Sequence, residues 1–221
     1  MNPKHYKTGI ANGIVIILLL LFPHFVPLPF YSYAIVCLAL VFVLLRRRKE
    51  DFGTLGLKKP PRPVGHVLLV GIVSALGWAA FMRWVYVPLI FYIFPGYVTP
   101  YTEYDFIRNH IATLVITLIA AWLVGGLYEE LVFRGFIQKS LQEATARNRY
   151  SFWISGILTS ILFGTYHWQQ GIFGIIATGM TGIYWTWLFR RYRQNLWYPI
   201  VSHALYDTIT LLLIYFDLFG R

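Results

Sequence analysis

The residues of this sequence that could do chemistry are acids and histidines placed inside apolar runs. Glu129 and Glu130 stand together at the end of one run, His167 lies in a second, and His203 and Asp207 lie in a third. An ionisable side chain within a membrane segment costs about 2.5 to 3.5 kcal/mol on insertion scales. We therefore expect these side chains to face one interior cavity rather than lipid.

Spacing distinguishes the two adjacent glutamates. Glu130 and Arg134 are four residues apart, so they face each other on a helix and can pair. Glu129 points about 100° further round the same helix and has no local partner. An unpaired acid in a membrane segment indicates function, which makes Glu129 the first candidate for chemistry.

The histidines admit a structural interpretation when each is taken alone. His167 can be an interhelical hydrogen-bond partner. His203 and Asp207 are four residues apart and share a helix face, so they can form a structural pair. Taken together, three polar sites on separate apolar runs favour one shared cavity.

Together these residue types fit the hydrolysis of an amide by an activated water. A carboxylate beside a neutral histidine can take a proton from water, whose oxygen then attacks a carbonyl carbon. A second histidine can donate to the developing oxyanion. No serine or cysteine has a base at suitable spacing, and Ser202 points to a different helix face from His203. The residues therefore favour an activated water over covalent catalysis.

The elements that must position these residues are membrane helices. The chain has 221 residues, of which 57% are hydrophobic and 13% charged, whereas an ordinary soluble domain is about a quarter charged. The apolar residues cluster in blocks long enough to cross a bilayer, and no segment shows the alternation of a β-barrel. We predict an all-α, multi-pass transmembrane helix bundle that forms a single domain over residues 1–221. Cys37 is the only cysteine, so no intramolecular disulfide is expected.

We expect about seven spans, and the basic residues indicate their orientation. The predicted spans cover residues 9–22, 31–45, 64–94, 106–128, 151–168, 172–189 and 197–219. With the N-terminus in the cytoplasm, 16 of the 19 Lys and Arg residues fall in cytoplasmic segments, as the positive-inside rule requires. The net charge of +10 therefore indicates membrane orientation and a lipid bilayer as partner, not nucleic acid. The predicted location is the cell membrane, of a prokaryote rather than the endoplasmic reticulum.

Three motifs in order identify a family. The pattern Glu129-Glu130-x-x-x-Arg134, then Phe163-x-x-x-His167, then His203-x-x-x-Asp207 resembles the CAAX-prenyl-protease and bacteriocin-processing (CPBP, or Abi) family of intramembrane glutamic endopeptidases. The resemblance covers about residues 106–217, and the spans within residues 1–105 have no assigned role. It implies an endopeptidase without cofactor or metal that acts on a membrane-associated peptide or protein tail.

The resemblance also implies a role for each motif residue. Glu129 and His167 would activate the water, while His203 and Asp207 would form the oxyanion hole. Glu130 and Arg134 would hold the site together, and Phe163 would pack the helix that carries His167.

One motif residue departs from the family pattern. Position 207 is often Asn in the prenyl-protease branch, and an ionised Asp207 cannot donate to an oxyanion as an amide can. Asp207 is therefore either protonated or serves to orient His203 and keep it protonated.

The expected span boundaries conflict with a shared site. Glu129 would lie near the inner, cytoplasmic end of the fourth span, where the site is expected to open. His167 would lie about 24 Å into the fifth span. Straight helices with these boundaries would keep the two apart, so we expect the boundaries rather than the motifs to be wrong.

Two other functions fit parts of the pattern. Glu129, His167 and His203 are residue types that can bind zinc, but the local His-Glu-x-x-His arrangement of a metalloprotease is absent. A non-catalytic membrane scaffold or a bacteriocin-immunity protein would use the same polar residues only to hold helices together.

Overall fold

The computed structural model describes residues 3–26, 28–96, 101–146 and 148–218, and within them the chain is helical with no strand. The predicted all-α fold is therefore confirmed. The α-helices have these bounds: α1 Pro3–Phe25, α2 Tyr33–Arg47, α3 Val64–Phe81, α4 Val87–Ile93, α5 Ile111–Ala120, α6 Gln138–Ala144, α7 Ser151–Tyr166, α8 Gly171–Arg191 and α9 Trp197–Tyr215.

Several of these helices join end to end through π-helical turns. The turn at Met82–Tyr86 links α3 to α4, so that residues 64–93 form one 30-residue helix. Two π-helical segments, Ala121–Glu129 and Leu131–Ile137, link α5 to α6 in one 34-residue helix over residues 111–144. A π-helical turn adds a residue to the helix and changes which way the following side chains point, and such turns are frequent at functional sites.

The long helix over residues 111–144 corrects the predicted end of the fourth span. The fourth span does not end at Tyr128, because the helix continues without a break to Ala144. Part of the segment between the predicted fourth and fifth spans, up to Ala144, therefore belongs to this same helix. Polar residues that follow Glu130 made the apolar run look complete, although Arg134 and Gln138 are buried.

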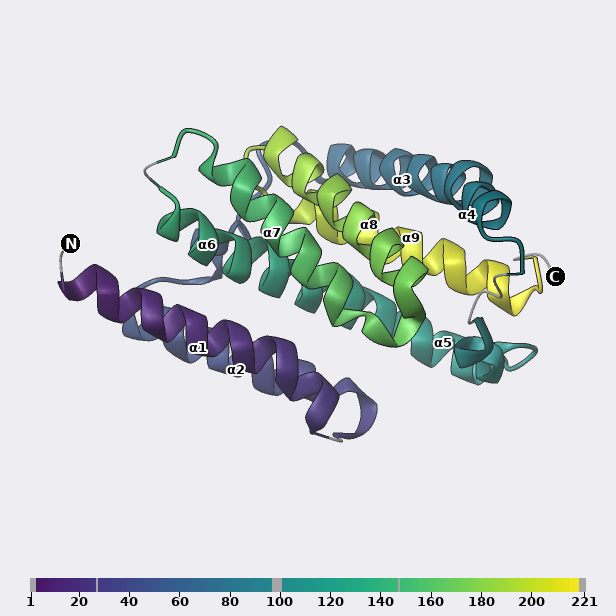
Figure 1. The fold of residues 1–221 in the computed structure, drawn as a ribbon, viewed down its shortest axis with the longest axis horizontal. Helices are drawn as coiled ribbons and strands as arrows, with labels where there is room; N and C mark the ends of the chain where they lie inside the picture. The colour runs from purple at the N-terminus through teal and green to yellow at the C-terminus, as the bar shows by residue number, and fades with distance from the viewer. Residues whose placement is uncertain (1–2, 27, 97–100, 147, 219–221) are drawn as a thin grey trace.

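Consecutive long helices run up and down the bundle. Figure 1 shows the α1–α2 hairpin along one side, with the 111–144 helix, α7, α8 and α9 beside one another. Helix α1 begins near one end of the bundle and α9 ends near the other.

The segments rich in Lys and Arg meet at the end of the bundle where α1 begins. Lys139 of α6 pairs with Glu50 of the α2–α3 connection, their Nζ and Oε2 atoms being 2.8 Å apart. The backbone N–H of Leu196 donates to the carbonyl of Gly56 at 3.0 Å, which joins the same connection to the start of α9. The predicted grouping of basic segments at one end is therefore present.

The outer surface of the bundle is apolar. Large hydrophobic side chains are exposed along α1, α3, α5 and α7, among them Ile17, Leu69, Ile116 and Ile161. Three helices, over residues 64–93, 111–144 and 168–191, are long and apolar enough to cross a membrane, and residues 9–25 and 151–166 form shorter apolar helices. An apolar surface of this extent indicates contact with lipid.

Small residues bring α7 and α8 together. A Cβ on Gly164 would lie 2.6 Å from the carbonyl oxygen of Ile175 and 3.2 Å from Cα of Gly179. Only glycine permits this close approach of two backbones, which is how membrane helices gain packing energy without a hydrophobic driving force. The contact fixes α7, and with it the His167 that follows its last turn.

Candidate functional site

Glu129 is the last residue of the first π-helical segment and lies in the middle of the 111–144 helix. Fifteen residues separate it from Ala144, which is about 22 Å of helix. Helix α7 returns antiparallel from Ser151, and His167 lies sixteen residues along it, about 24 Å from its start. The longer helix therefore brings the two residues to the same depth and removes the conflict in the predicted boundaries.

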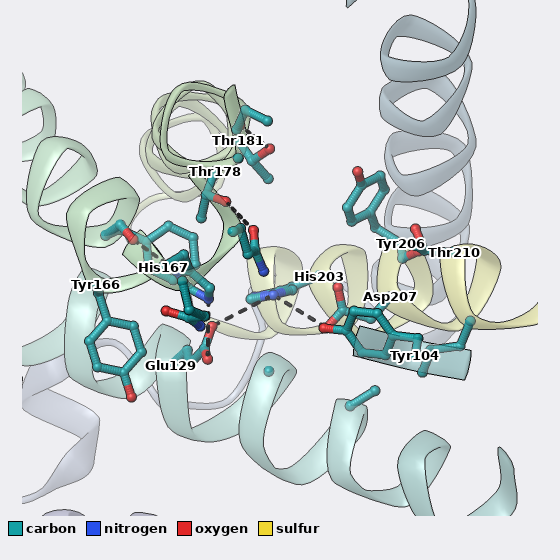
Figure 2. Close-up of a pocket in the computed structure, with 18 of the residues that line it drawn as sticks. Tyr104, Glu129, Tyr166, His167, Thr178, Thr181, His203, Tyr206, Asp207 and Thr210 are labelled. Atoms are coloured by element: carbon teal, nitrogen blue, oxygen red, sulfur yellow. Dashed lines mark hydrogen bonds and ion pairs between the residues drawn. The ribbon is translucent and has the colours of Figure 1, made fainter. Parts of the chain in front are cut away.

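Glu129 lies between two imidazoles (Figure 2). Its Oε1 is 3.9 Å from Nε2 of His167, and its Oε2 is 3.9 Å from Nε2 of His203. These distances are too long for direct hydrogen bonds and suit a water that bridges the two groups. The side chain of Glu129 is only 10% exposed, so its carboxylate is well removed from bulk solvent.

The end of α7 sets the orientation of His167. His167 is the C-cap residue of α7, where the last carbonyls of a helix have no partner within it. Its Nδ1 lies 2.9 Å from the carbonyl oxygen of Phe163, which can only accept, so Nδ1 carries the proton. In the neutral ring, Nε2 is then an acceptor that faces Glu129.

A second set of charges holds His203. Its Nδ1 lies 2.9 Å from Oε1 of Glu130, and the same oxygen lies 3.1 Å from Nη1 of Arg134. Both side chains of the Glu130–Arg134 pair are fully buried. The pairing that the spacing predicted is thus present. Breaking a buried pair by removing one partner costs about 3–5 kcal/mol.

Asp207 completes the group from the next turn of α9. Its Oδ2 lies 3.5 Å from Nε2 of His203. The side chain of Asp207 is more exposed than those of Glu129 and Glu130. The structure therefore brings Glu129, His167, His203 and Asp207 together, as expected from the sequence. Figure 2 shows Asp207 on the far side of His203 from Glu129.

Aromatic rings pack the imidazoles. Phe163 stands edge-on to His167 at 4.8 Å between ring centroids, and the guanidinium of Arg134 lies 4.3 Å from the centre of the same phenyl ring. Trp185 of α8 stacks on His203 with 3.7 Å between centroids and 25° between planes. Trp185 could not be identified from the sequence, because a tryptophan in an apolar helix has no spacing that marks it.

Gly125, one turn before Glu129, also contributes to the site, although its sequence context does not indicate this. A Cβ at this position would overlap Oδ2 of Asp207 and lie 3.5 Å from Nε2 of His203. The glycine therefore lets α9 place its two polar side chains against the 111–144 helix.

The four residues line a cavity of about 490 Å³, a size typical of ligand sites. Other lining residues come from the first half of the chain, including His24, Tyr33 and Tyr86. The spans without an assigned role therefore form part of the wall. His24 also packs on Tyr166, the residue before His167, with 4.7 Å between ring centroids.

The cavity extends from the four residues toward the end of the bundle opposite the basic segments. Its walls include the end of α1, the end of α4, the start of α8 and the second half of α9. The expectation that the site opens toward the basic, cytoplasmic end is therefore wrong for this cavity. The error followed from placing Glu129 at a helix end.

Comparison with known proteins relates the chain to a protease family and to a bacterial protein. Residues 111–209 match the family model described as "Type II CAAX prenyl endopeptidase Rce1-like". A protein of Bacillus subtilis (strain 168), named "Putative membrane peptidase YdiL", is 24% identical over 179 residues, which cover 81% of this chain and 68% of the relative. No solved structure matches the chain. The predicted resemblance to the CPBP family is confirmed, and the matched segment contains all three motifs.

Proposed function

Residues 111–209 match the model of an Rce1-like family of CAAX prenyl endopeptidases, and we propose that the chain is an intramembrane endopeptidase in which Glu129 and His167 activate the hydrolytic water. The observation that carries the proposal is the position of Glu129, 3.9 Å from each of two imidazole nitrogens in one cavity. The substrate would be a peptide or protein tail at the membrane, which binds along the apolar and aromatic walls.

The first step is attack by water. A water between Glu129 and Nε2 of His167 gives a proton to Glu129 as its oxygen bonds to the peptide carbonyl carbon. His167 accepts the second hydrogen bond of this water, because its own Nδ1 proton is held by Phe163. Two fixed acceptors orient the attacking lone pair, which reduces the entropy lost on reaching the transition state.

The second step is stabilisation and collapse of the tetrahedral intermediate. His203 donates from Nε2 to the oxyanion while its Nδ1 donates to Glu130, so it carries both ring protons. Asp207, 3.5 Å from Nε2, offsets the positive charge of the ring. Glu129 then passes its proton to the amide nitrogen as the C–N bond breaks, which regenerates the carboxylate.

We also propose a multi-pass arrangement in a prokaryotic plasma membrane, with the N-terminus in the cytoplasm. The grouping of basic segments at one end supports this orientation. Substrate would then reach the cavity from the opposite side of the membrane.

The test is proteolysis of a fluorogenic peptide by protein reconstituted in liposomes. Glu129→Gln keeps the shape of the side chain and removes the base, so kcat should fall by about 10²–10⁴-fold with an unchanged melting temperature. Glu143→Gln, a change at an acid with a half-exposed side chain, is the matched control and should be active. A folded Glu129→Gln variant with wild-type kcat would refute the proposal.

The two competing functions give different results in this assay. A scaffold would show no cleavage by the wild type, and its Glu129 variants would lose helix packing instead. A metalloprotease would lose activity after exhaustive chelation and recover it with zinc, whereas the proposed mechanism predicts unchanged activity.

A further inference from the structure

Polar side chains continue beyond the catalytic group along one face of the 111–144 helix. Glu130, Arg134, Gln138 and Gln142 follow one another at intervals of four residues, so successive members lie on the same side of the helix. Glu130, Arg134 and Gln138 are at most 1% exposed, while Gln142 is partly exposed. This row runs from the catalytic group toward the basic end of the bundle.

Many polar atoms of this row have no protein partner. Both side-chain polar atoms of Gln138, Nε and Nη2 of Arg134, and Oε2 of Glu130 accept or donate no hydrogen bond among the described residues. The buried hydroxyls of Thr159 in α7 and Thr186 in α8 are likewise unpartnered within the described chain. We call these residues the polar seam: Glu130, Arg134, Gln138, Gln142, Thr159 and Thr186.

The seam is a junction of three helices. A Cβ on Gly156 of α7 would contact Cγ2 of Thr186 and lie 3.2 Å from Nε2 of Gln138. A Cβ on Gly182 of α8 would lie 3.1 Å from Nη2 of Arg134. The side chains of Gln138 and Arg134 therefore point between α7 and α8, where glycines leave space beside them.

The seam ends at a second cavity, which lies at the basic end of the bundle. This cavity has a volume of about 410 Å³ and is lined by Arg134, Gln138 and Gln142 together with Lys58 and Lys139. At its other end, the seam reaches Glu130, whose Oε1 lies 2.9 Å from Nδ1 of His203. The row of polar atoms thus joins an open polar cavity to the catalytic group.

We propose that the polar seam is a water path, by which water reaches the catalytic group from the basic end of the bundle. Buried polar atoms without a protein partner are paired with ordered water in folded proteins. Water of this kind requires two to four polar partners, which consecutive seam residues supply. The role in hydrolysis rests on the proposed function, whereas the presence of water in the seam does not.

A separate path has a physical purpose at this site. Substrate fills the first cavity, whose walls include Phe91, Phe173 and Ile214, and excludes water from that side. Each turnover consumes one water, which must then be replaced from elsewhere. The guanidinium of Arg134 lies within the seam and carries a positive charge, which opposes the passage of protons and cations beyond it.

Access to the seam can be measured with a water-sized probe that needs no catalysis. We would place a single thiol at Thr186→Cys, on the basic side of Arg134, in a Cys37→Ala background. Silver ion added in nitrate buffer blocks an accessible thiol, and alkylation after denaturation counts the thiols that remain. Ala75→Cys is the control, because Ala75 is fully buried in α3 and is not part of the seam.

We expect silver to block Thr186→Cys at least about tenfold faster than Ala75→Cys, since a thiol at a dry site reacts only through local unfolding. Equal rates in folded protein would overturn the proposal. If Thr186→Cys does not fold, Thr159→Cys reports on the same seam from α7. Neither result depends on whether the protein is a protease.

Gln138→Leu separates a wet seam from a dry one by activity and stability. In a wet seam, leucine interrupts the row of polar partners, so kcat falls while KM stays constant. In a dry seam, leucine removes two unpaired polar groups, so the melting temperature rises and kcat is unchanged. The second result overturns the proposal. Ser140→Ala, also buried and polar but not part of the seam, is the control and should leave kcat unchanged.

Discussion

A methyl group at position 125 should disable the site without unfolding the protein. In Gly125→Ala, the new Cβ would overlap Oδ2 of Asp207 and come within 3.5 Å of Nε2 of His203. To regain van der Waals contact, the Asp207 carboxylate must move by about 1 Å, and a misplacement of that size costs roughly 10²-fold in rate. That loss corresponds to about 2.7 kcal/mol in the activation free energy.

Stability should change in the opposite direction. The side chain of Asp207 is 28% exposed to the cavity, so it can move without disturbing the core. Alanine in a helix interior is favoured over glycine by about 0.5–1 kcal/mol. The melting temperature of Gly125→Ala should therefore equal or slightly exceed that of the wild type, which separates a displaced catalytic group from a misfolded one.

The assay is kcat on a fluorogenic peptide, with two comparisons. Gly77→Ala is the matched control, because a Cβ on this α3 glycine would meet nothing within 4 Å. In an Asp207→Ala background, the overlap is gone, so Gly125→Ala should cost little further activity. Wild-type kcat in Gly125→Ala, or a full further loss in the Asp207→Ala background, would refute the reasoning.

Three further predictions concern charge and packing. Asp207→Asn keeps a polar group but removes the charge beside Nε2 of His203, so kcat should fall about tenfold, or ~1.4 kcal/mol; unchanged activity would show that the charge is not needed. Trp185→Leu should lower both the melting temperature and kcat, because stacked rings contribute about 0.5–1.5 kcal/mol beyond burial; Trp185→Phe should recover part of both, and equal losses in the two variants would argue against stacking. Burial alone would raise the pKa of Glu50, but its hydrogen bond and ion pair with Lys139, together with a hydrogen bond from Thr54 and the charge of Arg48, leave the pKa below its ordinary value of 4.5. Glu50 therefore contributes stability above pH 4.5 that is lost as the pH falls through the lowered pKa. The melting temperature of Glu50→Gln should be lower than that of the wild type at pH 7 and approach it in acid. A difference in melting temperature that persists in acid would contradict a stabilising role of the ionised carboxylate.

Short-range pairings in this chain could be predicted from sequence, because they depend only on helix geometry. Glu130 and Arg134 face each other across one turn, and so do His203 and Asp207. The positions of apolar runs likewise predicted where the helices lie. These properties follow from periodicity and hydrophobicity, which the sequence contains directly.

The depth of the site could not be predicted, because burial of polar residues is decided by other helices. Arg134 and Gln138 look like the start of an aqueous segment, yet α7 and α8 cover both of them. The stacking of Trp185 on His203 also requires the packing of α8 on α9. No local pattern distinguishes this tryptophan from those that face lipid, such as Trp187, which is 47% exposed.

The two adjacent glutamates show how one helix serves both structure and chemistry. Glu130 is fully buried, and its Oε1 is bound by both Arg134 and His203. Glu129 points into the cavity and lies 3.9 Å from each imidazole, without a direct hydrogen bond to either. In the proposed mechanism, the carboxylate that faces the cavity is the general base, while its neighbour holds the histidine that donates to the oxyanion. Exchange of their roles would require rotation of the helix by about 100°, so Glu130 cannot replace Glu129 as base even though it is the next residue.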